Sequence, residues 1–191
     1  SDVRMQQTCA AVGQGILISR YREFFSKYGV KIAQILLTYN DLDDKKAKIN
    51  MGNSINTLLE LGVIPIINEN DPISINELGP SFGDNDNLSA MVACNVKADT
   101  LIILTNVDGL YDKNPNSKDA KIIHDVRNFD NISDLDGASD GLGIGGIKTK
   151  IAAAKLATSC GIKAIMANGT KAWVLDDIMN GKKIGTVFSQ K

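Results

Sequence analysis

A glycine-rich run before a predicted helix is the densest candidate for binding chemistry in this sequence. It reads Asp140-Gly-Leu-Gly-Ile-Gly-Gly-Ile-Lys-Thr-Lys150. Glycines let a ligand approach the backbone, the free N–H groups of a helix start attract anions, and Lys148 and Lys150 add full positive charges. The run therefore predicts a phosphate site. A flexible hairpin followed by a lysine-bearing helix is the alternative interpretation.

Two familiar phosphate loops do not fit this run. Gly141, Gly143 and Gly146 match G-x-G-x-x-G, but a loop precedes them where the dinucleotide fold requires a strand. Ile147 stands where a P-loop requires its lysine. The run therefore indicates phosphate binding outside these two folds.

Two further segments are rich in polar side chains. They are Asn68-Glu-Asn-Asp71, after a predicted strand, and Gly83-Asp-Asn-Asp-Asn87, before a predicted helix. Such groups can hold a small zwitterion by its ammonium and carboxylate, or ligate a hard cation. Turns and a helix N-cap at Asn85 or Asp86 are the alternative, and capping and binding can coexist. The second run lacks the glycine and the distal glutamate of a calcium-binding EF-hand loop, which leaves calcium sensing without support.

A third polar segment, Leu104-Thr-Asn-Val-Asp-Gly-Leu-Tyr-Asp112, follows a predicted buried strand. In a doubly wound sheet this position faces the ligand, because ligands bind beyond the carboxyl ends of the strands. A plain strand followed by a turn has the same appearance.

Composition excludes several classes of function. In 191 residues, 21 Lys and Arg oppose 22 Asp and Glu, so no overall basic field attracts nucleic acid or an anionic membrane. The single histidine, His124, argues against histidine-rich zinc sites and a serine protease triad. Three widely spaced cysteines favour reduced, buried thiols, and no apolar run is long enough to span a bilayer. We therefore expect a soluble cytoplasmic protein.

Hydrophobic periodicity predicts strands that alternate with helices. The first helix places Val12, Ile16, Leu17, Tyr21, Phe24 and Phe25 on an apolar face, for a core or for a partner subunit. The expected helices cover residues 6–27, 40–61, 86–96, 147–160 and 174–180, and the expected strands cover 31–38, 63–67, 100–105, 162–167 and 184–188.

This alternation favours an α/β fold, a three-layer αβα sandwich with a mainly parallel sheet. The length of 191 residues favours one domain over 1–191. The polar segments at the strand ends should therefore carry the chemistry.

In this order, the polar segments resemble the amino acid kinase family, over nearly the whole chain. The paired Asn-Glu-Asn-Asp and Gly-Asp-Asn-Asp motifs favour its glutamate branch over the acetylglutamate, aspartate, uridylate and isopentenyl phosphate branches. Further matching segments are Ala10-Ala-Val-Gly-Gln14, Pro65-Ile-Ile-Asn-Glu-Asn-Asp71, Leu104-Thr-Asn-Val-Asp-Gly-Leu-Tyr111, the Gly141 to Lys150 loop and Gly185-Thr-Val-Phe188.

The resemblance implies the amino acid kinase fold and transfer of phosphate from ATP, with Mg²⁺, to the γ-carboxylate of L-glutamate, the entry step to proline. An ionised carboxylate nucleophile requires no general base. By their matching positions, Asp71 and Asn85 are implied to bind glutamate, with Asn68 and Asp84 lining the same site.

The resemblance also implies the nucleotide-binding and catalytic residues. Lys150 is implied to stabilise the phosphoryl group in flight, and Asp86 to orient catalytic lysines; no side chain is implied as a metal ligand. The implied ATP contacts are Thr105, Asn106, Ile144, Gly145, Gly146, Ile147, Lys148, Thr149 and Lys150.

Three features of the family are missing from the sequence. Neither the Lys-x-Gly-Ser strand that begins such kinases nor their Ser-Gly-Ala segment occurs, so we expect an N-terminally incomplete kinase domain that is impaired on its own. The C-terminal RNA-modification-type (PUA) domain is also missing, as in the kinase half of bifunctional pyrroline-5-carboxylate synthases. The residues of Asn168-Gly-Thr170 and Gly181-Lys-Lys-Ile-Gly-Thr186 also resemble those of the bifunctional synthases.

The resemblance further implies a homo-oligomer with proline as feedback inhibitor. Two alternatives stay open from the residues. One is a kinase of the same fold for another acceptor, and the other is a non-catalytic domain that binds an amino acid or a nucleotide as a regulator.

Overall fold

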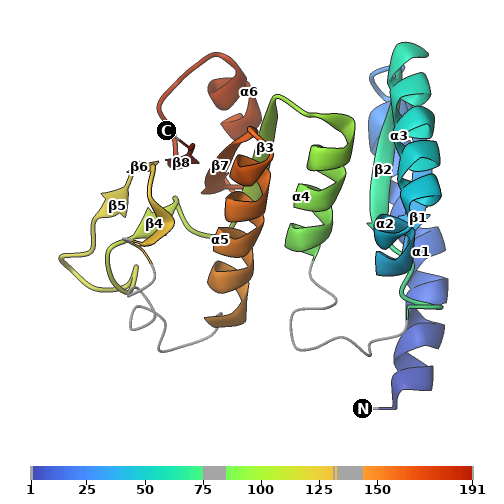
Figure 1. Ribbon diagram of the computed structural model, residues 1–191, viewed down its shortest axis with the longest axis horizontal. Helices are drawn as coiled ribbons and strands as arrows, with labels where there is room; N and C mark the ends of the chain where they lie inside the picture. Colours follow the sequence, from blue (N-terminus) through green and yellow to red (C-terminus); the bar gives the residue numbers. More distant parts are fainter. Residues whose placement is uncertain (1, 75–84, 131, 133–143, 191) are drawn as a thin grey trace. The chain divides into compact units, whose positions relative to one another are not determined.

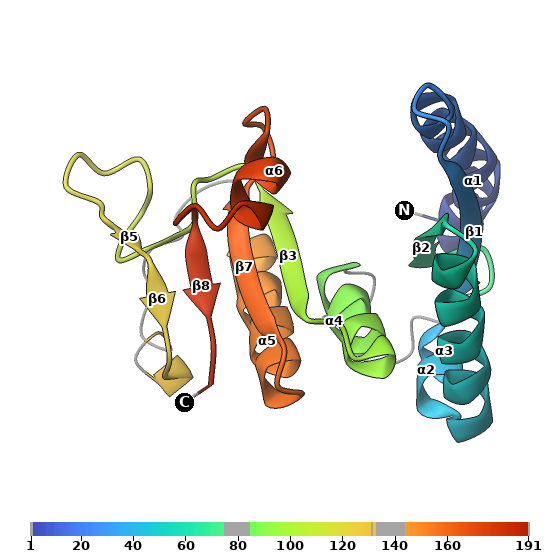
Figure 2. The same ribbon diagram turned by 90° about the horizontal axis from the view of Figure 1, so that it is seen from above.

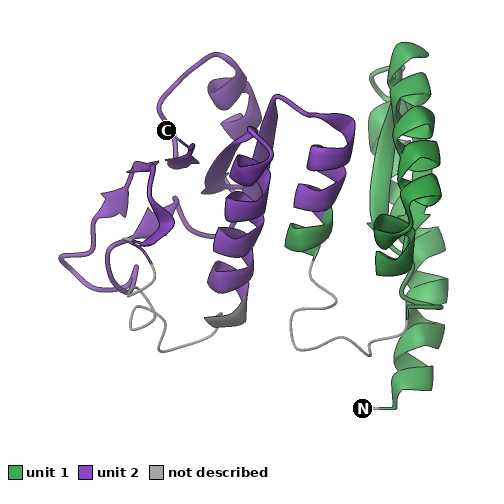
Figure 3. Ribbon diagram, viewed as in Figure 1, with its two compact units in different colours: residues 1–88 green, residues 89–191 purple. Residues whose placement is uncertain are grey.

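The computed structural model describes residues 2–74, 85–130, 132 and 144–190. The chain divides into two compact units, residues 1–88 and residues 89–191 (Figure 3). The single domain expected over residues 1–191 stays a prediction.

Unit 1 places helices on both sides of a parallel strand pair. Strand β1 (Lys31–Leu37) pairs with β2 (Val63–Glu69), with Gln34 opposite Ile66 and Leu36 opposite Asn68. Helix α1 (Val3–Ser26) lies on one side of the pair and α3 (Lys45–Glu60) on the other (Figure 2). Residues alternate between these two sides along each strand.

The helix expected over 40–61 is two helices in the structure. Thr38 caps α2 (Tyr39–Asp43) in a reciprocal capping box with Asp41. Asp44 then has extended backbone and caps α3, because its carboxylate accepts a 2.7 Å hydrogen bond from the N–H of Ala47. Local side-chain capping therefore interrupts a continuous helical pattern.

The apolar face expected on the first helix is not buried within unit 1. Val12 is 65% exposed and Phe24 is 59% exposed, and α1 has no buried residue. Gln14 and Ile18 instead lie against the strands. The helix was predicted correctly; of its expected apolar face, Leu17 lies beside Gln14 and Ile18 and Phe25 is half-buried, whereas Val12 and Phe24 are exposed.

Unit 2 is built on a mixed sheet with the strand order β3-β7-β8-β6 (Figure 1). Strand β3 (Thr100–Thr105) is parallel to β7 (Lys163–Asn168), whereas β8 (Thr186–Phe188) is antiparallel to β7 and parallel to β6 (Asp125–Val126). A separate antiparallel ribbon joins β4 (Leu110–Tyr111) to β5 (Ile122–Ile123). The helices are α5 (Ile144–Ser159), α6 (Val174–Met179) and α4 (Asn85–Val96), whose residues 85–88 are counted in unit 1.

Small side chains let α5 pack closely in the core of unit 2. Ala153, Ala154 and Ala157 recur at helical spacing and are all fully buried, in one cluster with Met166 and Phe188. Alanine has the highest helix propensity and a small radius, so it supports the helix and the close packing at once.

Gly185 and Thr186 hold the start of β8 in place. Gly185 has a φ of +72°, and a Cβ built there would lie 2.0 Å from the carbonyl oxygen of Met166. The hydroxyl of Thr186 donates to the carbonyl of Ile123 at 2.6 Å and accepts from the N–H of Leu110 at 2.8 Å. One buried hydroxyl therefore connects β8 with β4 and β5.

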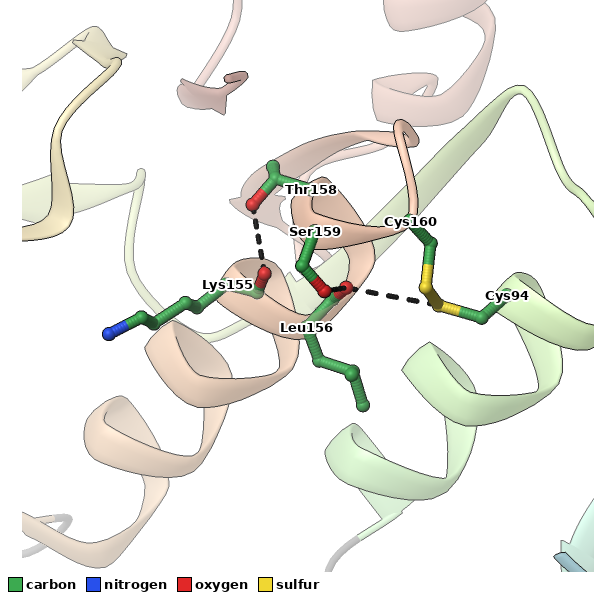
Figure 4. Close-up of a disulfide and its surroundings, with 6 residues drawn as sticks. All are labelled: Cys94, Lys155, Leu156, Thr158, Ser159 and Cys160. Carbon is green, nitrogen blue, oxygen red and sulfur yellow. Dashed lines mark hydrogen bonds between the residues drawn. A yellow bond between two sulfur atoms is a disulfide. The ribbon is translucent and has the colours of Figure 1, made fainter.

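A disulfide joins Cys94 of α4 to Cys160, directly after α5 (Figure 4). The Cα atoms are 5.7 Å apart although the residues are separated by 66 positions. The expectation of reduced, buried thiols is therefore wrong for this pair, and Cys9 is free but exposed. The spacing of the cysteines could not predict this disulfide, because the two sulfurs meet only when α4 and α5 lie side by side in the fold.

None of the described helices combines the length and the apolar character that crossing a bilayer requires.

Candidate active site

The residues expected to bind the acceptor lie mainly around the end of β2 in unit 1. Asn68 is the second-last residue of the strand, and Asp71 follows in the turn after it. Both side chains are half-buried, and neither has a hydrogen-bond partner among the described residues. Half-buried polar groups without internal partners are available to a polar ligand.

A small cleft adjoins Asn68 on the α1 side of the strand pair. Glutamine side chains from α1 and β1 line it together with three aliphatic side chains. The lining residues are Gln14, Leu17, Ile18, Gln34, Ile66 and Asn68. The sequence offered no reason to assign a role to Gln14 or Gln34, although Gln14 ends one of the matching motifs.

The turn that carries Asp71 is tightly held. The N–H of Asn70 donates to the carbonyl of Leu37 at 2.8 Å, and the N–H groups of Ile73 and Ser74 each donate to the carbonyl of Asn70 at 3.0 Å. Residues 70–74 therefore form a single closed turn at the carboxyl end of β2.

The second motif expected to bind glutamate, Gly83-Asp-Asn-Asp-Asn87, overlaps the start of α4. Asp84 lies outside the described residues, whereas Asn85 is exposed and Asp86 is half-buried in the first helical turn. An acidic side chain in the first turn interacts favourably with the helix dipole. Asn85 and Asp86 both lie inside the helix, so neither is the N-cap that the sequence predicted.

The expected nucleotide contacts lie at the carboxyl end of β3 in unit 2. Thr105 is half-buried and Asn106 is exposed, and the Thr105 hydroxyl donates to Asn106 Oδ1 at 3.4 Å. Thr105 pairs with Asn168, and its carbonyl accepts a 2.8 Å hydrogen bond from Gly169 N–H. The ends of β3 and β7 thus form one polar edge, where a parallel sheet binds its ligands.

The same edge carries a charged cluster that the sequence did not predict. The Asn168 amide donates to Asp108 Oδ1 at 2.8 Å, and Lys171 Nζ lies 2.7 Å from the same oxygen. The hydrogen bond from Lys171, followed by that from Asn168, holds the pKa of Asp108 below its ordinary value. The 60 positions between Asp108 and Asn168 gave the sequence no signal for this contact.

The glycine-rich run enters α5 earlier than expected. The helix begins at Ile144 rather than Ile147, so Ile144, Gly145 and Gly146 belong to its first turn. A Cβ at Gly146 would meet no heavy atom within 4 Å, and the Thr149 hydroxyl donates to the Gly146 carbonyl at 3.1 Å. The first turn of this helix is therefore open at Gly146.

Helix α5 leads directly into β7 and packs along it, so the helix runs antiparallel to β3 and β7. Its first turn consequently lies toward the carboxyl ends of these strands (Figure 2). Lys148 is exposed and Lys150 is half-buried. The fold of unit 2 therefore places both parts of the expected ATP site at the same end of the sheet. That this site adjoins the unit 1 residues expected to bind glutamate stays a prediction.

The single histidine contacts the residue just before β8. His124 directs Nδ1 to the carbonyl oxygen of Gly185 at 3.1 Å, beside β6 and β8. This contact gives His124 a structural role in the sheet.

Comparison with known proteins identifies relatives over nearly the whole chain. A profile described as the amino acid kinase family matches residues 1–168. A protein named glutamate 5-kinase from Methanosarcina barkeri is 48% identical over 190 residues, which cover 98% of this chain and 50% of the relative. Another from Clostridium perfringens is 47% identical and is covered over 72% of its length, against 99% of this chain. The chain spans about half the length of the relatives from Methanosarcina barkeri, Methanococcoides burtonii and Thermoanaerobacter.

Solved structures share the fold at low sequence identity. The UMP kinase of Bacillus anthracis superposes with a TM-score of 0.65 at 16% identity, over 98% of this chain and 70% of the other. The isopentenyl phosphate kinase of T. acidophilum has a TM-score of 0.57 at 20% identity, over 85% and 61%. These similarities confirm the α/β fold class expected from the sequence.

Proposed function

The chain belongs to the amino acid kinase family, and we propose that it forms part of a glutamate 5-kinase. Such an enzyme transfers the γ-phosphoryl group of ATP to the γ-carboxylate of L-glutamate and produces glutamyl 5-phosphate, the first step of proline biosynthesis.

One observation carries the choice of substrate. Relatives named glutamate 5-kinase match 96–98% of this chain at 44–48% identity in archaea and bacteria. The solved structures named for other acceptors are 16–20% identical and support only the fold.

The acceptor residues suit a dicarboxylic amino acid. Asp71 offers a carboxylate to an ammonium group, and Asn68 and Asn85 offer amide donors to a carboxylate. The half-buried position of Asn68 and Asp71 partly removes water, which strengthens such hydrogen bonds. In the proposed site they bind and orient glutamate, and Asp84 lies outside the described residues.

The residues expected to bind ATP can position the nucleotide and neutralise the charge of its phosphates. Phosphoryl transfer requires donors and cations around the transferred group more than acid–base chemistry. In the proposed mechanism, Lys150 from α5 neutralises charge on the moving phosphoryl group, Asp86 orients the catalytic lysines, and the first turn of α5 holds the phosphates. Thr105 and Asn106 contact the nucleotide at the end of β3.

The donor set fits a magnesium ion that arrives with ATP. In the described part of the chain, no three His, Cys, Asp or Glu side chains gather into a metal cage. Mg²⁺ in phosphoryl-transfer sites is held largely by substrate phosphates and water with one or two carboxylates. When bound, it supplies part of the positive charge that the transferred phosphoryl group requires.

Three further properties are proposed from the family membership alone. They are assembly as a homo-oligomer, feedback inhibition by proline and a cytoplasmic location.

Trapping of acyl phosphate by hydroxylamine tests the proposal. The natural full-length protein receives ATP and Mg²⁺ with glutamate, aspartate or N-acetylglutamate as acceptor. Hydroxamate from glutamate alone supports the proposal, and hydroxamate from another acceptor indicates a different kinase of the family. Binding of nucleotide or glutamate without hydroxamate from any acceptor contradicts the proposal and indicates a regulatory domain.

A further inference from the structure

The turn that carries Asp71 is closed by a buried carboxylate. Glu69 is only 4% exposed, and its Oε1 accepts a 2.5 Å hydrogen bond from the hydroxyl of Ser74. Burying a carboxylate costs free energy unless hydrogen bonds compensate it. The Glu69–Ser74 bond therefore stabilises the turn only while both ends remain together.

Helix α1 holds the same two residues from outside the turn. Gln14 Nε2 donates to the carbonyl of Glu69 at 3.2 Å, and Gln7 Nε2 donates to the carbonyl of Ser74 at 3.4 Å. The two glutamines are seven positions apart, which places them on one side of the helix, two turns apart. Both ends of the turn are thus bonded to one rigid element.

We define Glu69, Ser74, Gln7 and Gln14 as the turn bracket. Asp71 lies inside it, and the Asp71 carboxylate has no hydrogen-bond partner among the described residues. Several hydrogen bonds therefore fix the backbone of this turn, whereas the Asp71 carboxylate can still bind a ligand. Such an arrangement is typical of a preorganised ligand-binding residue, whose supporting contacts reduce the entropy lost on binding.

We propose that the turn bracket is a positioning device for Asp71, which sets the affinity of the site for the amino-acid substrate without touching that substrate. The inference rests on the proposed function, because the ligand that Asp71 receives is taken to be glutamate. Loss of a bracket hydrogen bond lets the turn sample other conformations, and the substrate then binds more weakly. Binding of ATP, which uses other residues, is unaffected.

The first test measures the turn itself and needs no catalysis. In amide hydrogen exchange, Ser74→Ala should speed exchange of the Ile73 and Ser74 amides about tenfold, because their bonds to Asn70 lose the bracket. Ser74→Thr keeps a hydroxyl and should stay within twofold of wild type. Ser19→Ala, which removes a similar serine hydroxyl bonded to the Gly15 carbonyl on exposed α1, is the matched control.

Amides of the β1–β2 ladder separate local from global effects. If Ile66 exchanges faster by the same factor as Ile73 in Ser74→Ala, the hydroxyl only stabilises unit 1 as a whole and the proposal is overturned. Unchanged exchange at Ile73 overturns it equally.

The second test measures kinetics in the natural full-length protein. Ser74→Ala and Gln14→Met should raise KM for glutamate about tenfold, with KM for ATP within twofold of wild type, whereas Ser74→Thr and Ser19→Ala should change neither. Glutamate KM within twofold of wild type in both bracket variants overturns the inference while the kinase assignment stands. A wild-type protein that makes no acyl phosphate overturns the kinase assignment, and amide exchange still decides whether the bracket orders the turn.

Discussion

Asn168 donates a 2.8 Å hydrogen bond to the carboxylate of Asp108, which connects the last residue of β7 to the segment after β3. Lys171 adds an ion pair to the same oxygen, and the Gly169 N–H adds a bond to the Thr105 carbonyl. The neighbours of Thr105 and Asn106 are therefore held by contacts across the sheet edge. This edge gives unit 2 a prepared surface at the expected nucleotide position.

The ionised Asp108 carboxylate should make the free energy of unfolding fall at acidic pH. Lys171 and Asn168 lower the pKa of Asp108 in the folded protein, so its contribution to stability is present above the unfolded pKa of about 3.9 and is lost as pH falls through the lower folded pKa. Urea unfolding at a series of pH values between 3 and 7 measures this effect. Asp108→Asn should reduce the loss of stability in the acid range. Identical acid slopes in wild type and Asp108→Asn would contradict the assignment.

Lys150 should be required for turnover. In the proposed mechanism its charge stabilises the transferred phosphoryl group, and removal of such a group commonly costs about 10²-fold or more in rate. Lys150→Ala should therefore reduce kcat for acyl phosphate formation by at least about 10²-fold with a circular dichroism spectrum like that of wild type. Lys155→Ala, an exposed change farther along the same helix, should keep kcat within twofold. Full activity in Lys150→Ala would contradict the catalytic role.

Thr186 should stabilise unit 2 through its hydroxyl. Thr186→Val keeps the shape but leaves the Leu110 N–H and the Ile123 carbonyl without their partner. Unpaired buried polar groups cost about 1–3 kcal/mol each, so we expect a loss of roughly 2–4 kcal/mol in the free energy of unfolding.

Thr158→Val is the matched control for that variant. Thr158 is also buried, but its hydroxyl donates to the Lys155 carbonyl within the same helix (Figure 4). Its replacement should cost less than about 1 kcal/mol, because a local side-chain bond of this kind adds little to the helix. Equal losses in the two variants, measured by urea unfolding, would show that the hydroxyl of Thr186 makes no special connection.

Reduction of the Cys94–Cys160 disulfide should lower stability. The bridge closes a long loop, with a separation of 66 positions, so its loss should cost roughly 2–4 kcal/mol in the free energy of unfolding. Thermal unfolding with and without dithiothreitol measures this cost, and Cys94→Ser should be insensitive to the reductant. Alkylation of the unreduced, denatured protein should label only Cys9; three labelled cysteines would show that the bridge does not form.

Local sequence patterns predicted most of the elements and the residues at their ends. A continuous apolar run and the helical spacing of apolar residues are local properties, so β3 over Thr100–Thr105 and the helix after the glycine-rich run could be recognised without knowledge of their partners. The polar motifs at Asn68–Asp71 and Leu104–Asp112 likewise indicated the carboxyl ends of strands, where ligands bind in parallel sheets. The sequence by itself thus determined the α/β class, the family and the candidate residues.

Contacts between distant segments were decided only by the tertiary structure. The apolar pattern of α1 did not reveal that Gln14, rather than Val12 or Phe24, meets the strands, because a helix with apolar residues on several sides has no single preferred face. The Cys94–Cys160 bridge, the Asp108–Asn168 bond and the Gln14–Glu69 bond each join residues at least 55 positions apart. Such pairs form when packing brings whole elements together, and spacing along the chain carries no record of that geometry.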